Sequence, residues 1–175
     1  MSKPQAPFLP LNIAVLCVSD SRTINEDTSG KYLADSLTDA GHHLADRKVI
    51  SDDIYQIRAV ISAWIADHNI HAIITTGGTG FYKRDSIPEA VSVLFDKSVD
   101  GFGEMFRLIS KDDIGMSTIQ SRAIAGMANN TGIFCLPGSS GACRTGWEGI
   151  LKAQLDNRTR PCNFVAHFLG ENPSH

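Results

Sequence analysis

Three apolar runs, each ending in small polar residues, constrain the fold of this 175-residue chain most strongly. They cover residues 11–18, broken only by Asn12, residues 72–75 and residues 131–136. Such runs are typical of strands covered on both faces. Segments with helical apolar spacing lie between them. The sequence therefore predicts an α/β fold: a single three-layer domain with a mostly parallel sheet covered by helices on both faces.

Capping residues and apolar spacing locate the other elements. Ser86 and Glu89 fit a capping box at a helix start, and Asp27 opens an earlier helix. A shorter strand is expected over residues 44–50, whereas residues 121–128 fit either a helix or a loop. Helices are expected over residues 27–41, 51–65, 86–95, 101–110 and 143–151, and residues 164–169 form a short apolar piece.

Composition narrows the class of protein. A hydrophobic content of 42% and a charged content of 20% are ordinary for a globular domain. The net charge of −3 gives no general attraction to nucleic acid or to an anionic membrane. No apolar run approaches the roughly 18 residues of a membrane helix. We expect a flexible arm over residues 1–10, the domain over residues 11–170 and a tail over residues 171–175.

The cysteines and histidines do not form a metal pattern. None of the four cysteines belongs to a C-x-x-C pair, so a zinc site is not expected and a reducing, cytoplasmic location fits best. Cys17 and Cys135 lie within apolar runs and are predicted to be buried. The adjacent His42 and His43 are interpreted as surface residues.

The glycine-rich segment after the second apolar run is the main candidate site. Residues 77–80 read Gly-Gly-Thr-Gly, and Lys83, Arg84 and Asp85 follow before the predicted helix. Glycines let backbone N–H groups approach a ligand, and a helix start favours negative charge. The segment matches neither the P-loop nor the complete dinucleotide-binding pattern. An anion site and a plain turn between strand and helix both remain open.

Two more predicted strands end in suitable residues. Ser19 and Asp20 follow the first strand, and residues 137–141 follow the last. Ligands of open α/β sheets bind beyond the carboxyl ends of the strands, so the three ends together favour a binding site. Asp85 is either an acid beside a phosphate and metal site or an acid that stabilises a helix start. Asp52 belongs to Ser51-Asp52-Asp53, a run that is typical of a helix cap.

Several ordered blocks of residues resemble the MoaB/Mog family of molybdenum cofactor biosynthesis proteins. The main block is residues 75–80 followed by Arg84-Asp85 and Pro88-Glu89-Ala90. Residues 18–20, 101–104, Ser121-Arg122 and residues 136–139 agree as well, and residues 159–164 are similar to the MoaB branch. The resemblance runs from about residue 11 to residue 155. Ser51 and Ile87 depart from it, since they stand where the family usually has proline and threonine.

The resemblance implies transfer of AMP from ATP to the phosphate of molybdopterin, with Mg²⁺ as cofactor. Asp85 and Asp52 match the family's functional acids and are the candidate catalytic residues and magnesium ligands. The candidate nucleotide- and molybdopterin-binding residues are Ser19, Asp20, Thr76, Gly77, Gly78, Thr79, Gly80, Arg84, Ser121, Arg122, Pro137, Gly138, Ser139 and Ser140.

Two other functions remain open at the level of sequence. One is a carrier that binds molybdopterin without transferring AMP, and the other is a general nucleotide-binding α/β module. The resemblance also implies a homotrimer or homohexamer and contact with other proteins of the cofactor pathway. The apolar residues 164–169, together with Trp147, are expected to help cover a subunit interface.

Overall fold

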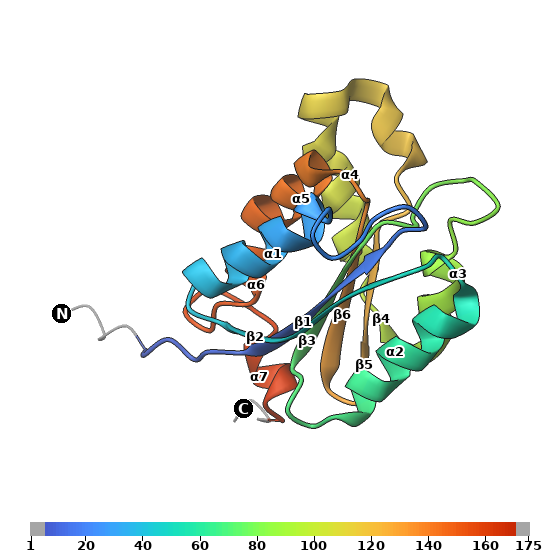
Figure 1. The fold of residues 1–175 in the computed structure, drawn as a ribbon. Coiled ribbons are helices and arrows are strands. Elements are labelled where there is room, and N and C mark those ends of the chain that lie inside the picture. The colour runs from blue at the N-terminus through green and yellow to red at the C-terminus, as the bar shows by residue number, and fades with distance from the viewer. Residues whose placement is uncertain (1–5, 171–175) are drawn as a thin grey trace.

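One six-stranded sheet forms the centre of the computed structural model, which describes residues 6–170 (Figure 1). Its strands lie in the order β2-β1-β3-β6-β5-β4. The first four in this order are parallel to one another, and β5 and β4 are antiparallel to their neighbours. The predicted mostly parallel sheet is confirmed. The strands are β1 (Asn12–Val18), β2 (His43–Ile50), β3 (Ala72–Thr76), β4 (Lys97–Ser98), β5 (Ile124–Ala128) and β6 (Thr131–Leu136).

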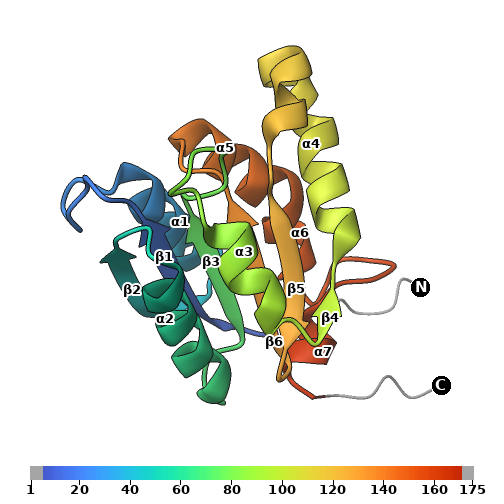
Figure 2. The ribbon, with the colours of Figure 1, turned by 90° about the vertical axis from the view of Figure 1, so that its right-hand side faces the viewer.

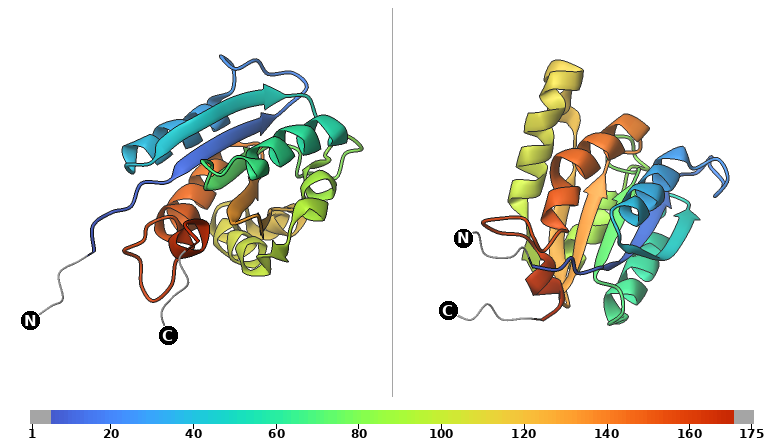
Figure 3. Two further views of the ribbon diagram at one scale, coloured as in Figure 1. Left: turned by 90° about the horizontal axis from the view of Figure 1, so that it is seen from below. Right: turned by 90° about the vertical axis from the view of Figure 1, so that its left-hand side faces the viewer.

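Helices cover both faces of this sheet, as predicted (Figures 1 and 3). The α-helices are α1 (Thr28–Asp39), α2 (Ile54–Ala66), α3 (Ile87–Val91), α4 (Asp100–Ile114), α5 (Ser140–Gly146), α6 (Lys152–Gln154) and α7 (Val165–Phe168). Two 3-10 segments, η1 (Ser92–Leu94) and η2 (Gly115–Gln120), follow α3 and α4. A π-helical turn, η3 (Trp147–Leu151), joins α5 to α6.

The strands divide their side chains between two apolar cores. Successive residues of a strand point to opposite faces, so Ile13 and Val15 face α1, α4 and α5 while Ala14 and Leu16 face α2 and α3. All four side chains are buried. The apolar runs of the sequence are therefore strands buried on both sides, and their carboxyl ends are left free to carry the site.

The prediction of a helix or loop over residues 121–128 is wrong, because residues 124–128 form β5. This strand pairs antiparallel with β6 through a tight hairpin in which Ala128 faces Thr131. Asn129 and Asn130 both have positive φ, of 49° and 64°. Asparagine tolerates this region better than most residues and favours two-residue hairpin turns. The small Gly126 makes room for Phe95, whose ring lies 2.3 Å from where a Cβ would stand.

The predicted capping box at α3 is also wrong. Ser86 occupies the cap position but makes no side-chain cap hydrogen bond. Glu89 forms an ion pair with Arg122 instead of turning back to the helix start. The helix is shorter than predicted, ending at Val91 before η1. Conversely, α4 is longer than predicted and continues through Ile114 into η2.

His42 is buried, although the sequence suggested a surface residue, whereas His43 is exposed as expected. The His42 Nδ1 atom accepts a hydrogen bond from the Leu11 backbone N–H at 3.1 Å, which joins the end of α1 to the start of β1. Cys17 and Cys135 are buried as predicted.

The described part of the predicted arm contacts the domain. Pro7 O accepts from the Asn157 side chain, and Leu9 N–H donates to it. Residues 1–5 of the arm and the predicted tail, residues 171–175, lie outside the described residues.

Candidate functional site

Backbone N–H groups are exposed to a ligand where the chain turns after β3. Gly77 and Gly78 have φ angles of +96° and +64°, and a Cβ on Gly77 would lie 2.2 Å from Val18 O. Glycine is therefore required at this turn. Among residues 6–170, no acceptor faces the N–H groups of Gly78, Thr79 or Gly80. Consecutive unpaired N–H groups of this kind form a concave site for an anion.

A cavity of about 670 Å³ opens beside this glycine loop, residues 77–80. Its size suits a small organic molecule rather than a single ion. The predicted site residues that line it are Gly77, Gly78, Thr79, Gly80, Asp85, Ser121, Pro137, Gly138 and Ser139. The structure therefore brings the second and third predicted strand ends together around one cavity.

Asp85 lies at this cavity and also closes a turn of the loop. Its Oδ2 atom accepts a hydrogen bond from Tyr82 N at 2.8 Å, while Asp85 N donates to Tyr82 O at 2.9 Å. Within the described part of the chain, Asp85 Oδ1 has no hydrogen-bond donor. One carboxylate oxygen thus fixes the loop, and the other is free to bind a ligand.

Asp52 is not the cap of α2, because that position belongs to Asp53. The Asp53 carboxylate accepts from Tyr55 N and Gln56 N at 3.0 and 2.9 Å. The Asp52 carboxylate turns to the glycine-loop side of the molecule, where Oδ1 accepts from Ser86 N at 3.1 Å. Asp52 does not line the large cavity itself.

Burial and neighbouring charges disfavour the ionised form of Asp52. Burial raises the pKa of its carboxyl above the usual range, against the hydrogen bonds from Ser86. The charges of Asp85 and Asp20 raise this pKa further. The carboxylates of Asp85 and Asp20 thus each lie close enough to Asp52 to disfavour its negative charge, and a nearby cation would relieve this repulsion.

Asp20 links the first strand end to the other two acids. Its Oδ1 atom accepts from Asp52 N at 3.1 Å and from Arg84 Nη2 at 2.9 Å. Both side chains of the ion pair are well exposed, so the pair contributes little to stability. Arg84 is therefore held near the acids by a contact that a phosphate ligand can replace.

Arg122, a predicted phosphate-binding residue, is hydrogen-bonded to the loop in the structure. Its guanidinium donates to Gly80 O and to Asp85 O, the latter at 2.8 Å, and pairs with Glu89. The guanidinium also lies over the ring of Phe81, 5.2 Å from its centroid. These bonds fix both ends of the segment that carries Asp85, so the structure gives Arg122 a positioning role outside the large cavity.

Five other predicted residues also lie outside the lining of the cavity: Ser19, Asp20, Thr76, Arg84 and Ser140. Thr76 is buried, and its hydroxyl donates to Pro137 O at 3.0 Å, which ties the end of β3 to the end of β6. Ser140 Oγ lies 3.3 Å from Thr28 Oγ1, and Ser19 Oγ accepts a weak hydrogen bond from Ser21 N.

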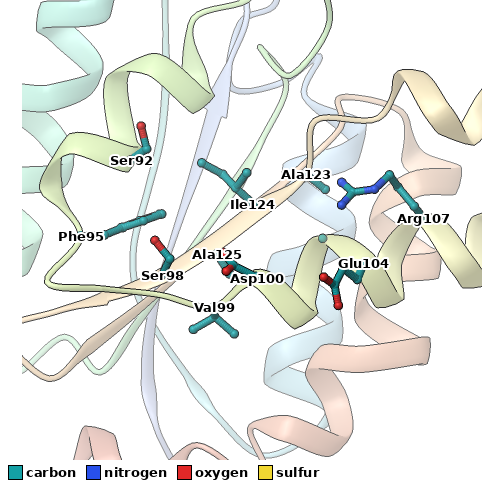
Figure 4. A pocket seen from close by; sticks show the side chains of 11 residues that line it. Ser92, Phe95, Ser98, Val99, Asp100, Glu104, Arg107, Ala123, Ile124 and Ala125 are labelled. Atoms are coloured by element: carbon teal, nitrogen blue, oxygen red, sulfur yellow. The ribbon is translucent and has the colours of Figure 1, made fainter.

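A different cavity lies at the β4 edge of the sheet, away from these residues. Figure 4 shows its lining, to which α4 contributes Glu104 and Arg107 and the β4–β5 edge contributes Ser98 and Ile124. Its volume is about 320 Å³. None of the predicted site residues lines it, and Arg107 already donates to Ser121 O.

Sequence reasoning missed one wall of the large cavity. The residues of this wall come from α4, η2, α5 and the segment 81–84. The spacing of four of them in the sequence is helical and could have indicated the wall. Phe106, Ser110, Asp113 and Ser117 recur at spacings of four, three and four, which places them on one side of a helical segment. Tyr82 and Gly141 lie within the predicted strand-end segments, and the missed lining residues are Phe106, Ser110, Asp113, Ile114, Ser117, Gln120, Ala142 and Thr145.

Two kinds of feature are absent from the described residues. Residues 6–170 contain no helix of the length and hydropathy needed to cross a membrane. The same residues contain no cluster of three or more histidine, cysteine, aspartate or glutamate side chains that could hold a metal ion by themselves.

Comparison with known proteins identifies the family. The family described as "Probable molybdopterin binding domain" matches residues 14–157. Molybdenum cofactor biosynthesis protein B of Escherichia coli K12 is 53% identical over 168 residues, which cover 96% of this chain and 99% of that protein. Its counterpart in Bacillus subtilis is 38% identical, covering 90% of this chain and 93% of that protein.

Solved structures agree with this assignment. A crystal structure of a molybdenum cofactor biosynthesis protein B superposes with a TM-score of 0.83 at 39% identity, covering 86% of this chain and 94% of that one. The tungsten cofactor synthesizing protein MoaB of Pyrococcus furiosus has a TM-score of 0.72 at 34% identity, covering 83% and 92%. With its glycine loop, neighbouring acids and near-complete match, this chain belongs to the molybdopterin-binding MoaB/Mog family of molybdenum cofactor biosynthesis, in the MoaB branch.

Proposed function

We propose that this protein transfers AMP from ATP to the terminal phosphate of molybdopterin, giving adenylyl-molybdopterin and pyrophosphate. A phosphate oxygen of molybdopterin attacks the α-phosphorus of ATP, and the bond from that phosphorus to pyrophosphate breaks. The attacking group is already an anion, so no protein nucleophile is needed. Catalysis then consists of positioning and charge stabilisation.

One observation carries the proposal: unpaired N–H groups and the Asp85 carboxylate lie at a single cavity, and the carboxylate of Asp52 lies behind the same loop. The three free N–H groups of the glycine loop favour phosphate oxygens. Asp85 lies beside them, and Asp52 carries a raised pKa through burial and through the charges of its neighbours. A site that holds only phosphates would be weakened by these acids, whereas phosphates bound together with a cation need them.

The residues present fit Mg²⁺. This ion commonly takes one or two protein carboxylates and completes its shell with water and substrate phosphates. Asp85 Oδ1 and Asp52 Oδ2 have no hydrogen-bond donor among residues 6–170, so each can serve as a ligand. When bound there, the ion would neutralise charge on the phosphate oxygens of ATP.

The chain's other residues hold and orient the substrates in this proposal. The N–H groups of Gly78, Thr79 and Gly80 bind phosphate oxygens and leave the α-phosphorus accessible. Arg84 leaves its ion pair with Asp20 and donates to a substrate phosphate, because hydrogen bonds between a guanidinium and a phosphate are strong. Arg122 acts indirectly, because it fixes the ends of the loop that presents Asp85.

Adjacent acids offer a matched test. Asp52→Asn and Asp53→Asn remove the same charge at neighbouring positions, but only Asp52 contacts the glycine-loop side of the site. We expect Asp52→Asn to lower the rate of pyrophosphate release about 100-fold while molybdopterin binding changes little, because the interaction is made mainly in the transition state. Asp53→Asn should keep the rate, since asparagine caps helices as well as aspartate. Equal rates in the two variants would refute the role of Asp52.

The alternative function is that of a molybdopterin carrier, and the same assay distinguishes it from an enzyme. A protein that binds molybdopterin but releases no pyrophosphate from ATP would be a carrier of the same pathway. The proposal places the protein in the cytoplasm, where ATP is at hand and thiols stay reduced. The four cysteines of the described chain form no disulfide, which agrees with that location.

A further inference from the structure

The large cavity has two chemically different walls. The glycine loop forms one wall and offers N–H donors that suit phosphates. The other wall belongs to α4 and η2, which rise above the carboxyl ends of the strands (Figure 2). Binding of phosphates accounts for the N–H donors of the first wall. It does not say which part of a ligand contacts the second wall.

The α4–η2 wall combines an apolar surface with hydrogen-bond acceptors. Ile114, which is 52% exposed, supplies most of the apolar surface, Phe106 reaches the lining from the buried core, and Ala142 adds to it from the neighbouring α5. Asp113 is the only carboxylate that α4 and η2 contribute to the lining. A carboxylate here repels phosphate, so this part of the cavity suits a flat, uncharged ring that carries N–H donors.

Asp113 is held in place by a neighbouring helix. Thr145, from α5, donates its hydroxyl to Asp113 Oδ2 at 3.3 Å. Each carboxylate oxygen can accept more than one hydrogen bond. In the described part of the chain no donor is paired with Asp113 Oδ1. The carboxylate is therefore oriented by one weak bond and keeps acceptor capacity on both oxygens for a ligand.

We propose that the α4–η2 wall binds the ring of a pterin, and that Asp113 reads its 2-amino-4-oxo edge. This inference rests on the proposed function and assigns the molybdopterin half of the cavity. The pterin edge presents N2–H and N3–H side by side, two donors that match two carboxylate oxygens. Guanine presents the same pair of donors. Adenine presents a donor beside an acceptor and does not match a carboxylate, so ATP binds elsewhere along the cavity.

Asp113 is accordingly a specificity-determining residue, and Thr145 is a positioning residue that acts through it. Hydrogen bonds to a charged group typically distinguish ligands by a factor of about 10 to 100. Discrimination between pterins that differ only at position 2 is therefore the property that these two side chains supply.

The test compares two fluorescent probes that differ at that position. The probes are 6-hydroxymethylpterin monophosphate and its lumazine analogue, in which an oxo group replaces the 2-amino group. Titration of the full-length protein should show about 10-fold or greater preference for the pterin. Asp113→Asn should abolish this preference through weaker pterin binding, while ATP affinity stays within about twofold.

Asp112→Asn is the matched control, because it removes the same charge from an exposed residue that does not line the cavity. It should behave as the wild type in both titrations. Thermal melting shows whether each variant is folded. If Asp113→Asn does not fold, Thr145→Val replaces it and is expected to reduce the preference severalfold; an unchanged preference in Thr145→Val overturns the inference.

The outcomes separate the inference from the proposed function. Wild-type protein that binds neither probe overturns both. Wild-type protein that prefers the pterin, with the preference intact in folded Asp113→Asn, overturns only the role of Asp113. A loss of ATP affinity in Asp113→Asn with pterin affinity unchanged would assign this wall to adenine and overturn the inference as well.

Discussion

Neighbouring residues in this chain carry separate roles, and the pair Asp52 and Asp53 shows it best. Asp53 accepts two backbone hydrogen bonds at the start of α2. Asp52 accepts from Ser86 across a sequence separation of more than thirty residues. The stability of the helix and the chemistry of the site thus depend on different carboxylates, so their effects can be separated by substitution.

Asp85 is expected to matter more for chemistry than for folding. In Asp85→Asn the amide oxygen can still accept from Tyr82 N, so the turn survives and the melting temperature should change by only about 2–3 °C. Removal of the charge should lower magnesium-dependent AMP transfer by a factor of about 100 or more. Calorimetry and a pyrophosphate assay check the two parts. Unchanged turnover would refute the metal role, and a large loss of stability would support a structural one.

His42 makes the stability of the fold depend on pH. Burial lowers its pKa to about 4, whereas a histidine in the unfolded chain has a pKa near 6.5. As the pH falls below about 6.5, the unfolded state binds a proton before the folded state does, so stability is lost towards pH 4. The loss attributable to His42 is at most about 3 kcal/mol.

Denaturant unfolding between pH 7 and pH 4 measures this effect. His42→Asn keeps an acceptor for the Leu11 N–H but cannot titrate, so its free energy of unfolding should fall less steeply over that range. Parallel curves for the variant and the wild type would show that His42 is not the residue responsible.

At the scale of elements, the sequence predicts the buried half of the sheet better than its antiparallel edge. Runs such as residues 13–18 show uninterrupted apolar character, because both faces of those strands are covered. Residues 124–128 read Ile-Ala-Gly-Met-Ala, a short apolar stretch without polar alternation, so their pattern does not distinguish a strand from a helix. Their partner strand and the Asn129–Asn130 turn define β5, and such pairing is not visible in local apolar spacing.

The hairpin turn offers a direct check of this account. Asn130 has a φ of +64°, which a β-branched residue adopts only with strain. Asn130→Val should therefore lower the free energy of unfolding by about 1–3 kcal/mol. Asn130→Gly is the control and should leave it within about 1 kcal/mol. A neutral valine variant would mean that the turn does not hold β5 in register.

The candidate site was predictable only in part, because some of its residues carry local sequence signals and others meet only through tertiary packing. The glycine loop and the residues after β6 follow strand ends and carry local signals, and the structure brings them to one cavity. Asp113 and Thr145 meet there only because α4 and α5 pack side by side at its far wall. Ser86 and Glu89 fit the local pattern of a capping box. The box does not form, because Glu89 pairs with Arg122, a residue distant in sequence.

For the whole molecule, the distribution of apolar residues corrects one expectation. Of the residues expected at a subunit interface, Trp147, Val165 and Phe168 are buried within the chain's own core, whereas Leu169 is 37% exposed. Large apolar side chains are instead exposed along α4 and η2, among them Leu108 and Ile119, at 63% and 72%. Contiguous exposed apolar surface commonly marks a binding surface.

We expect the purified protein to form a closed assembly, a homotrimer or homohexamer. Light scattering coupled to size exclusion should give a mass of at least three subunits, about 57 kDa or more for a 19.0 kDa chain. Dilution over a hundredfold range serves as the control for weak association. A monomer that persists at the highest concentration would contradict this expectation.

The assembled protein either transfers AMP to molybdopterin or only binds it. The most direct measurement incubates the purified protein with molybdopterin, ATP and magnesium chloride and identifies the pterin product by mass. We expect adenylyl-molybdopterin and pyrophosphate to form in equal amounts, and neither product to form when a chelator removes magnesium. Binding of molybdopterin with no adenylylated product at any magnesium concentration would contradict this expectation.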